Sequence, residues 1–223
     1  MLKHTFFEAI FFDMDGTLVD SEPTWLESEI ELMARYNFAW TVENQAHCLG
    51  GPLARVGEYM NDLANRPESA TFFVNALVDL MVSKMSTRAT LMAGASQILA
   101  LTREIGTDIA MVSASPRVLV DAVLQAIYPV TFELTISSDD VQFPKPDPES
   151  YIKAAEHFGV NPERCLILED SKTGVNAAVA SGARVIAIPH LVPIEENEQV
   201  KVFSSLTEIN ERVLRKLYSD WFD

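Results

Sequence analysis

The sequence of 223 residues predicts an α/β protein, with a doubly wound parallel β-sheet of the Rossmann-like kind and an inserted α-helical domain. Three observations predict this class. Short apolar runs alternate with stretches of helical periodicity, each run ends in a small or acidic polar residue or a proline, and one long segment without such runs separates the first from the second. Continuous apolar runs are typical of strands buried on both faces, as in a parallel sheet.

Five apolar runs are predicted to be strands, at residues 9–12, 109–112, 134–136, 165–168 and 185–188. Asp13 follows the first run, Ser113 the second, and Glu169 with Asp170 the fourth. Ligands of doubly wound sheets bind outside the carboxyl ends of the strands. We therefore expect these polar residues to share one site.

Helices are predicted where apolar residues recur at spacings of three and four, over residues 95–105, 116–127, 148–158 and 173–181. Ser115 is the expected N-cap of the second helix, with Pro116 as its first residue. Gly159 and Gly182 stand where helices end, as C-cap glycines do.

Residues 21–88 form a segment too long for a simple crossover between parallel strands, which needs about a dozen residues. Its pattern predicts helices near residues 25–36, 56–63 and 71–84. We expect a catalytic core of residues 1–20 and 89–223, and a helical cap of residues 21–88. Such a cap would exclude water from the site and shape specificity.

The bulk composition is that of an ordinary globular protein, with a formal net charge of −15. This charge disfavours nucleic acids and anionic membrane surfaces as partners. No apolar run approaches the ~20 residues of a membrane span, and no signal-peptide pattern opens the chain. Cys48 and Cys165 belong to no CxxC pair. We expect a reduced, cytoplasmic protein that is a monomer.

The segment 13–17, DMDGT, directly follows the first predicted strand. Its two carboxylates can take different tasks, Asp13 as nucleophile or metal ligand and Asp15 as a proton donor and acceptor. Gly16 allows a sharp turn, and Thr17 offers a hydroxyl and an amide to an oxyanion. A calcium-binding EF-hand loop is disfavoured, because the acidic positions that follow are not in register.

This segment resembles the first motif of the haloacid dehalogenase superfamily. Three further motifs of that superfamily have counterparts in order: Ser113 at the end of a strand, Lys145 in the segment KPDP, and the pair Glu169–Asp170. The resemblance covers essentially the whole chain and extends to the group of β-phosphoglucomutase-like sugar phosphatases with a helical cap.

The resemblance implies a Mg²⁺-dependent phosphatase that forms a phospho-aspartyl intermediate on Asp13. It implies magnesium ligands from the Asp13 carboxylate, the Asp15 backbone carbonyl and Asp170, with Glu169 beside them. The phosphoryl group would contact three residues: Ser113, Ala114 and Lys145. The metal would offset the repulsion between a carboxylate nucleophile and a phosphate dianion.

Candidate substrate contacts lie in the predicted cap. The glycine turn at residues 49–52, with Gly51, is similar to the specificity turn of the family, and Arg55 follows it. Glu22, Trp25 and Arg55 are candidates for holding a sugar-like leaving group. Trp25 is as well explained as an ordinary core aromatic.

A sugar or polyol phosphate is the favoured substrate, by analogy with the family. Nucleotide monophosphates and phosphoglycolate stay open. Dehalogenases of the superfamily lack an acid at the position of Asp15, and phosphonate-cleaving relatives use a cap lysine, for which only Lys84 is present.

Three alternatives remain. A phosphomutase like β-phosphoglucomutase shares all four motifs. Such a mutase has a histidine in the first cap helix, whereas this chain has Trp25 near that position and no histidine there. A phospho-accepting receiver module would be shorter and would lack the large insert. A binding protein with an inactive site would not need the full set of catalytic residues.

Overall fold

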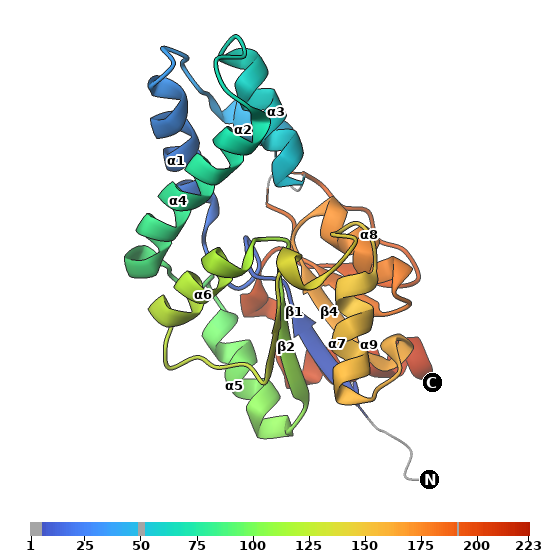
Figure 1. Cartoon of the computed structure of the whole chain (residues 1–223). Coiled ribbons are helices and arrows are strands. Elements are labelled where there is room, and N and C mark those ends of the chain that lie inside the picture. Colours follow the sequence, from blue (N-terminus) through green and yellow to red (C-terminus); the bar gives the residue numbers. More distant parts are fainter. Residues whose placement is uncertain (1–5, 49–51, 191) are drawn as a thin grey trace. The chain divides into compact units, whose positions relative to one another are not determined.

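A computed structural model of the chain describes residues 6–48, 52–190 and 192–223 (Figure 1). The chain divides into two compact units. The core unit comprises Met1–Val19, Leu91–Arg117 and Thr131–Asp223, and the cap unit comprises Asp20–Thr90 and Val118–Val130. Residues 118–130 group with the cap unit in this division, whereas the sequence predicts a cap of residues 21–88 alone.

The core unit is built on a sheet of six strands in the order β3–β2–β1–β4–β5–β6. All neighbouring pairs are parallel. The strands are β1 (Ala9–Phe12), β2 (Asp108–Val112), β3 (Leu134–Ile136), β4 (Leu166–Glu169), β5 (Arg184–Ala187) and β6 (Val200–Val202). This topology confirms the predicted fold class. The central strands β1, β2 and β4 are the ones whose ends carry the predicted site residues.

The apolar runs form strands because both faces of the sheet are covered. Alternate residues such as Phe11, Val112 and Ile167 belong to a core cluster with residues of α7 (Glu149–Phe158) and α8 (Lys172–Ala180). Their neighbours Ile10 and Phe12 face the other way and are also fully buried. The sheet therefore has no polar face, as expected for a doubly wound fold.

Two further helices complete the core unit, α5 (Ala95–Ile105) and α9 (Glu211–Phe222). Gly159 ends α7 in the left-handed conformation, with φ 66°, as predicted. Neither β6 nor α9 was predicted from the sequence. The ring of Phe7, just before β1, contacts Tyr218, Trp221 and Phe222 of α9, so this helix is fixed by an aromatic cluster.

The cap unit is helical and contains α1 (Glu22–Ala34), α2 (Val42–Cys48), α3 (Leu53–Leu63) and α4 (Ala70–Arg88). Most of α6 (Arg117–Ala126) belongs to it as well. The short helix α2 was not predicted. A cluster of buried side chains, including Leu32, Met60 and Phe73, forms the core of this unit. Among the described residues, no helix is both long and apolar enough to cross a membrane.

Candidate active site

Hydrogen bonds to the neighbouring strands fix the backbone at the ends of β1 and β2. The amide of Asp13 donates to the carbonyl of Leu168 at 3.0 Å, and the amide of Ser113 donates to that of Ile136 at 2.8 Å. Asp13 and Ser113 are both buried, with 6% and 2% of their surfaces exposed. Each predicted residue therefore continues a strand ladder by one position. Ala114, next to Ser113, is exposed.

Lys145 links the three central strands through its ammonium group. Nζ lies 2.8 Å from each of three acceptors: Oδ1 of Asp13, the carbonyl oxygen of Val112 and Oε1 of Glu169. An ammonium group has three hydrogens, so this arrangement uses all of them. We expected Lys145 to hold both Asp13 and the phosphoryl group. Its hydrogens go to these protein acceptors, which confirms its hold on Asp13, and its contact with the phosphoryl group stays a prediction.

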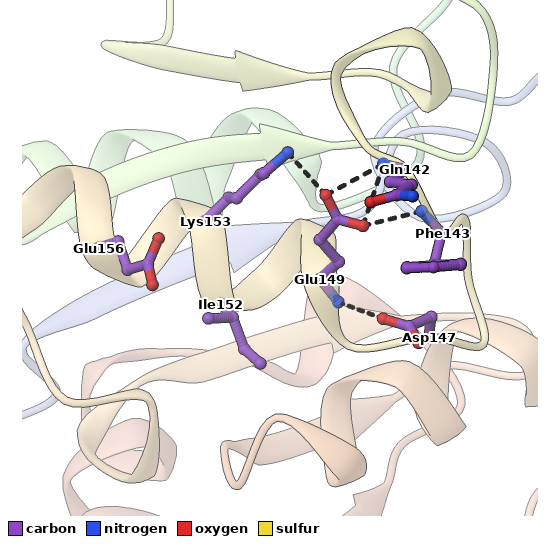
Figure 2. Close-up of a pocket in the computed structure, with 7 residues that line it drawn as sticks. All are labelled: Gln142, Phe143, Asp147, Glu149, Ile152, Lys153 and Glu156. Atoms are coloured by element: carbon purple, nitrogen blue, oxygen red, sulfur yellow. Dashed lines mark hydrogen bonds and ion pairs between the residues drawn. The ribbon is translucent and has the colours of Figure 1, made fainter.

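Glu149, at the start of α7, holds the segment that leads to Lys145. Its carboxylate accepts hydrogen bonds from the amides of Gln142, at 3.0 Å to each oxygen, and Phe143, at 2.7 Å. Lys153 forms an ion pair with the same carboxylate at 2.6 Å. Figure 2 shows this arrangement at the wall of a surface hollow of about 400 Å³.

Glu169 is fully buried and has protein donors on both carboxylate oxygens. Oε1 accepts from Lys145 and, at 2.7 Å, from the hydroxyl of Tyr151. Oε2 accepts from the amide of Asp170 at 3.2 Å and from Ser171, the N-cap of α8. Because both oxygens of Glu169 already accept hydrogen bonds from the protein, Glu169 is better placed to orient its neighbours than to bind a ligand directly.

The glycines at this edge make room for carboxylates. A Cβ atom on Gly16, which has φ +75°, would lie 2.3 Å from Oδ2 of Asp170, and one on Gly174 would lie 1.8 Å from Oε1 of Glu169. The carbonyl of Gly16 also lies 2.7 Å from Nε2 of His190. The DMDGT turn therefore needs glycine at position 16 both for its conformation and for the carboxylate beside it.

Burial and charge shift the ionisation of the central groups. The pKa of Asp13 is raised to about 8; burial contributes most, the charges of Glu169 and Asp15 also raise it, and Lys145 lowers it. Burial alone would lower the pKa of Lys145, but Asp13 and Glu169 raise it overall. Four carboxyl groups, those of Asp13, Asp15, Glu169 and Asp170, share the site with one ammonium group, that of Lys145. More positive charge is needed to keep Asp13 ionised near neutral pH.

A divalent metal ion fits this site. Ligand atoms of Asp13, Glu169 and Asp170 all lie within 4.8 Å of one another. Carboxylate oxygens are the ligands that hard cations such as Mg²⁺ prefer. The donor set and the excess of negative charge both match such an ion.

Asp15 lies beside two serine hydroxyls at the end of β2. Oγ of Ser115 donates to Oδ2 of Asp15 at 2.7 Å, and Oγ of Ser113 lies 3.4 Å from the same oxygen. The prediction that Ser115 caps the following helix was wrong. Helix α6 begins at Arg117, whose amide donates to Oδ2 of Asp139 at 2.8 Å. A side chain from the next loop does the capping, and no local sequence pattern indicated this.

The predicted substrate contacts lie in the cap unit. The carboxylate and the carbonyl of Glu22 accept from the Gln45 side chain, at 3.2 Å and 3.0 Å. Trp25 packs against the hydrophobic cluster of the unit, which agrees with a core role. Arg55 donates to the carbonyls of His47 and Cys48 at the end of α2. Gly51 lies outside the described residues.

Lys84, the one lysine of the predicted cap, is engaged with carboxylates. Its Nζ lies 3.2 Å from Oε1 of Glu27 and 3.0 Å from Oε2 of Glu31. A Schiff base requires a neutral amine. In the ion pairs with Glu27 and Glu31 the amine acts as a cation, which disfavours phosphonate cleavage through this residue.

Comparisons with known proteins identify relatives over nearly the whole chain. A family model described as haloacid dehalogenase-like hydrolase matches residues 10–188. Hexitol phosphatase B of Escherichia coli (strain K12) is 32% identical over 216 residues, covering 92% of this chain and 96% of that protein. The phosphorylated carbohydrates phosphatase of Thermotoga maritima is 26% identical, covering 82% and 86% of the two chains.

A solved structure with the same fold contains a bound phosphate. The structure of CbbY from Rhodobacter sphaeroides in complex with phosphate is similar, with a TM-score of 0.78 and 25% identity. The match covers 91% of this chain and 96% of that chain.

Proposed function

The chain belongs to the haloacid dehalogenase-like hydrolase family and is a phosphoric monoester hydrolase, and we propose that it hydrolyses a sugar or polyol phosphate through a phospho-aspartyl intermediate on Asp13. The observation that carries this proposal is the position of Asp13. It is buried at the end of β1, bound by Lys145 and within reach of the carboxylate of Asp170.

In the proposed first step, Asp13 attacks the phosphorus atom and the ester P–O bond breaks. Lys145 holds Oδ1 of Asp13 at 2.8 Å and so fixes the orientation of the carboxylate for the attack. The hydroxyl of Ser113 contacts the transferring group. Asp15 donates a proton to the leaving oxygen, so the alcohol departs neutral.

In the second step, Asp15 accepts a proton from water as the water attacks the phosphorus of the aspartyl phosphate. Inorganic phosphate leaves and Asp13 is regenerated. Two like charges about 4 Å apart repel by roughly 4 kcal/mol at an effective dielectric constant of about 20. Mg²⁺, which we propose is held by Asp13, Asp170 and the backbone carbonyl of Asp15, would supply charge neutralisation when bound. Glu169 would orient this set.

We propose a hexitol or hexose phosphate as the substrate class. Hexitol phosphatase B and the phosphorylated carbohydrates phosphatase are the relatives that support it. We also propose that the protein works in the cytoplasm as a monomer.

The test is a panel of phosphorylated metabolites with Mg²⁺, including hexitol phosphates, phosphoglycolate and nucleotide monophosphates, ranked by kcat/KM. We expect the hexitol and hexose phosphates to rank first. Asp13→Asn should abolish turnover while the protein stays folded, as judged by its circular dichroism spectrum. Turnover by this variant would remove Asp13 as the nucleophile.

The same panel separates the alternatives. A β-phosphoglucomutase-like mutase would convert a hexose 1-phosphate into its 6-phosphate with little release of inorganic phosphate. A receiver module would become stably phosphorylated and release none.

A further inference from the structure

Ser115 has a buried hydroxyl that serves neither helix capping nor the known motifs of the site. Only 6% of the surface of Ser115 is exposed, and its Oγ donates to Oδ2 of Asp15 at 2.7 Å. This is shorter than the 3.4 Å contact from Ser113 to the same oxygen. Ser115, rather than the motif residue Ser113, makes the stronger hydrogen bond to Asp15.

The backbone holds Ser115 in place independently of Asp15. Its amide donates to Oγ of Ser113 at 2.9 Å, and its carbonyl accepts from the amide of Ser138 at 3.0 Å. Because Asp139 caps α6, the hydroxyl of Ser115 is not required there. The loop after β2 therefore presents a fixed donor to the carboxyl group that exchanges protons with the substrate.

We propose that Ser115 is a positioning residue for Asp15, which it holds in the orientation that delivers a proton to the leaving oxygen. The inference rests on the proposed function. A hydroxyl on Oδ2 restricts rotation of the carboxyl group, and proton transfer requires close alignment of donor and acceptor.

A residue that positions Asp15 affects substrates with different leaving groups differently, whereas a residue that contacts the phosphoryl group does not. The alkoxide of a sugar or polyol needs a proton as it leaves, whereas nitrophenolate is stable without one. A displaced Asp15 therefore slows hydrolysis of an alkyl phosphate more than that of an activated aryl phosphate. A residue that binds the phosphoryl group affects both substrates equally.

The experiment compares sorbitol 6-phosphate with p-nitrophenyl phosphate as substrates of Ser115→Ala, by kcat/KM with Mg²⁺ saturating. We expect the fall for sorbitol 6-phosphate to exceed the fall for p-nitrophenyl phosphate by about tenfold, within the usual contribution of acid catalysis. Ser115→Thr, which keeps a hydroxyl group, should restore most of the ratio.

Two controls make the result decisive. Ser137→Ala removes a buried hydroxyl that donates to Oδ2 of Asp140 at 2.6 Å beyond the neighbouring strand, and should leave the ratio of the two substrates unchanged. In an Asp15→Asn background, Ser115→Ala should cause no further loss with sorbitol 6-phosphate. Equal falls for both substrates, or no fall, would overturn the proposal. A parent enzyme that hydrolyses neither substrate would instead refute the proposed function.

Discussion

Tyr151 is among the largest fully buried side chains of the core unit, yet its hydroxyl is bound to a carboxylate. Its ring also lies under the ammonium group of Lys145, with Nζ 4.7 Å from the ring centroid. Burial raises the pKa of Tyr151 well above its ordinary value, and the charges of Glu169 and Asp13 raise it further, so its hydroxyl stays a donor. One aromatic residue thus supports both Glu169 and Lys145.

Tyr151→Phe should raise the Mg²⁺ concentration needed for half-maximal activity by about tenfold. The change removes the donor to Oε1 of Glu169 but keeps the ring, and residues that support metal ligands typically contribute 10–100-fold to metal affinity. The measurement is a Mg²⁺ titration of phosphatase activity. Tyr218→Phe is the matched control, since this hydroxyl accepts from Arg164 instead. Identical titrations for both variants would contradict the role of Tyr151.

The buried carboxyl group of Glu29 makes the stability of the cap unit depend on pH. Its carboxylate is buried, with the Trp40 indole donating to Oε2 at 2.9 Å. Burial raises the pKa of Glu29 from 4.5 to about 7, although the Trp40 hydrogen bond lowers it. The folded protein holds this proton more tightly than the unfolded chain. Stability from this group is therefore complete below about pH 4.5 and is lost as the pH rises to about 7.

Glu29→Gln should remove that loss, so its free energy of unfolding relative to the parent should rise between pH 4.5 and pH 7.5 by on the order of 3 kcal/mol. Urea unfolding followed by tryptophan fluorescence measures it. Glu58→Gln, at an exposed position of α3, should show no such trend. Parallel pH curves for Glu29→Gln and the parent would contradict the assignment.

Among individual residues, the sequence predicts those whose role follows from a local pattern, such as an apolar run that ends in an acidic residue. Asp13, Asp15 and Asp170 stand within three residues after apolar runs, so their meeting at one sheet edge could be predicted. Ser115 and Tyr151 could not, because each bonds to a carboxylate that is distant in the sequence. The geometry around Glu22 and Arg55 depends on α2, which no strong periodicity indicated.

The loop between β3 and α7 positions Lys145 in the site. It carries Lys145 in a segment with prolines at 144, 146 and 148, and regular structure is confined to a short 3₁₀ turn near its start. Glu149 ties its middle to α7, and Lys153 donates to the carbonyl of Asp140 at 2.8 Å. The backbone amides and Lys153 lower the pKa of Glu149 to about 2, with the Lys153 hydrogen bond contributing most.

Glu149→Ala should lower kcat/KM by about tenfold, because a displacement of about 1 Å at a catalytic group can cost up to 10²-fold. The melting temperature should change little, since the ion pair is at the surface. Glu156→Ala removes the same charge from the same hollow, two turns further along α7, and should keep full activity (Figure 2).

A double-mutant cycle gives the decisive comparison. If Glu149 acts through Lys145, the loss from Glu149→Ala should shrink when Lys145→Ala is already present. An equal loss in both backgrounds would show that Glu149 acts by another route.

The elements that the sequence failed to predict are short or polar. Strand β6 has three residues with Lys201 at its centre, and α9 carries many charges with its apolar face turned to an aromatic cluster. Their stability comes from tertiary packing, which local propensity does not encode. The predicted strands β1 and β4 are buried on both faces, and this leaves a clear signal of continuous apolar residues.

At the scale of the whole molecule, negative charge dominates, and the formal net charge of −15 adds to the local repulsion in the site. A divalent cation that binds there should stabilise the folded protein. Mg²⁺ at about 100 times its Kd should contribute about 2.7 kcal/mol. This corresponds to a rise in melting temperature of roughly 5–10 °C.

Differential scanning calorimetry with and without Mg²⁺ measures this effect, with NaCl of equal ionic strength as the control. EDTA should reverse the shift and stop turnover. In Asp170→Asn the shift should largely disappear. A shift of the same size in this variant would place the stabilising cation elsewhere.

The order of strands in the sheet has a consequence for biosynthesis. Strand β1 lies between β2 and β4, but the ribosome makes it long before either of them. At about 5–20 residues per second, β1 waits on the order of ten seconds for β2 alone. During that interval the apolar segment Ala9–Phe12 has two open edges, which are templates for aggregation. This segment of the nascent chain is therefore exposed to aggregation until Leu166–Glu169 has emerged.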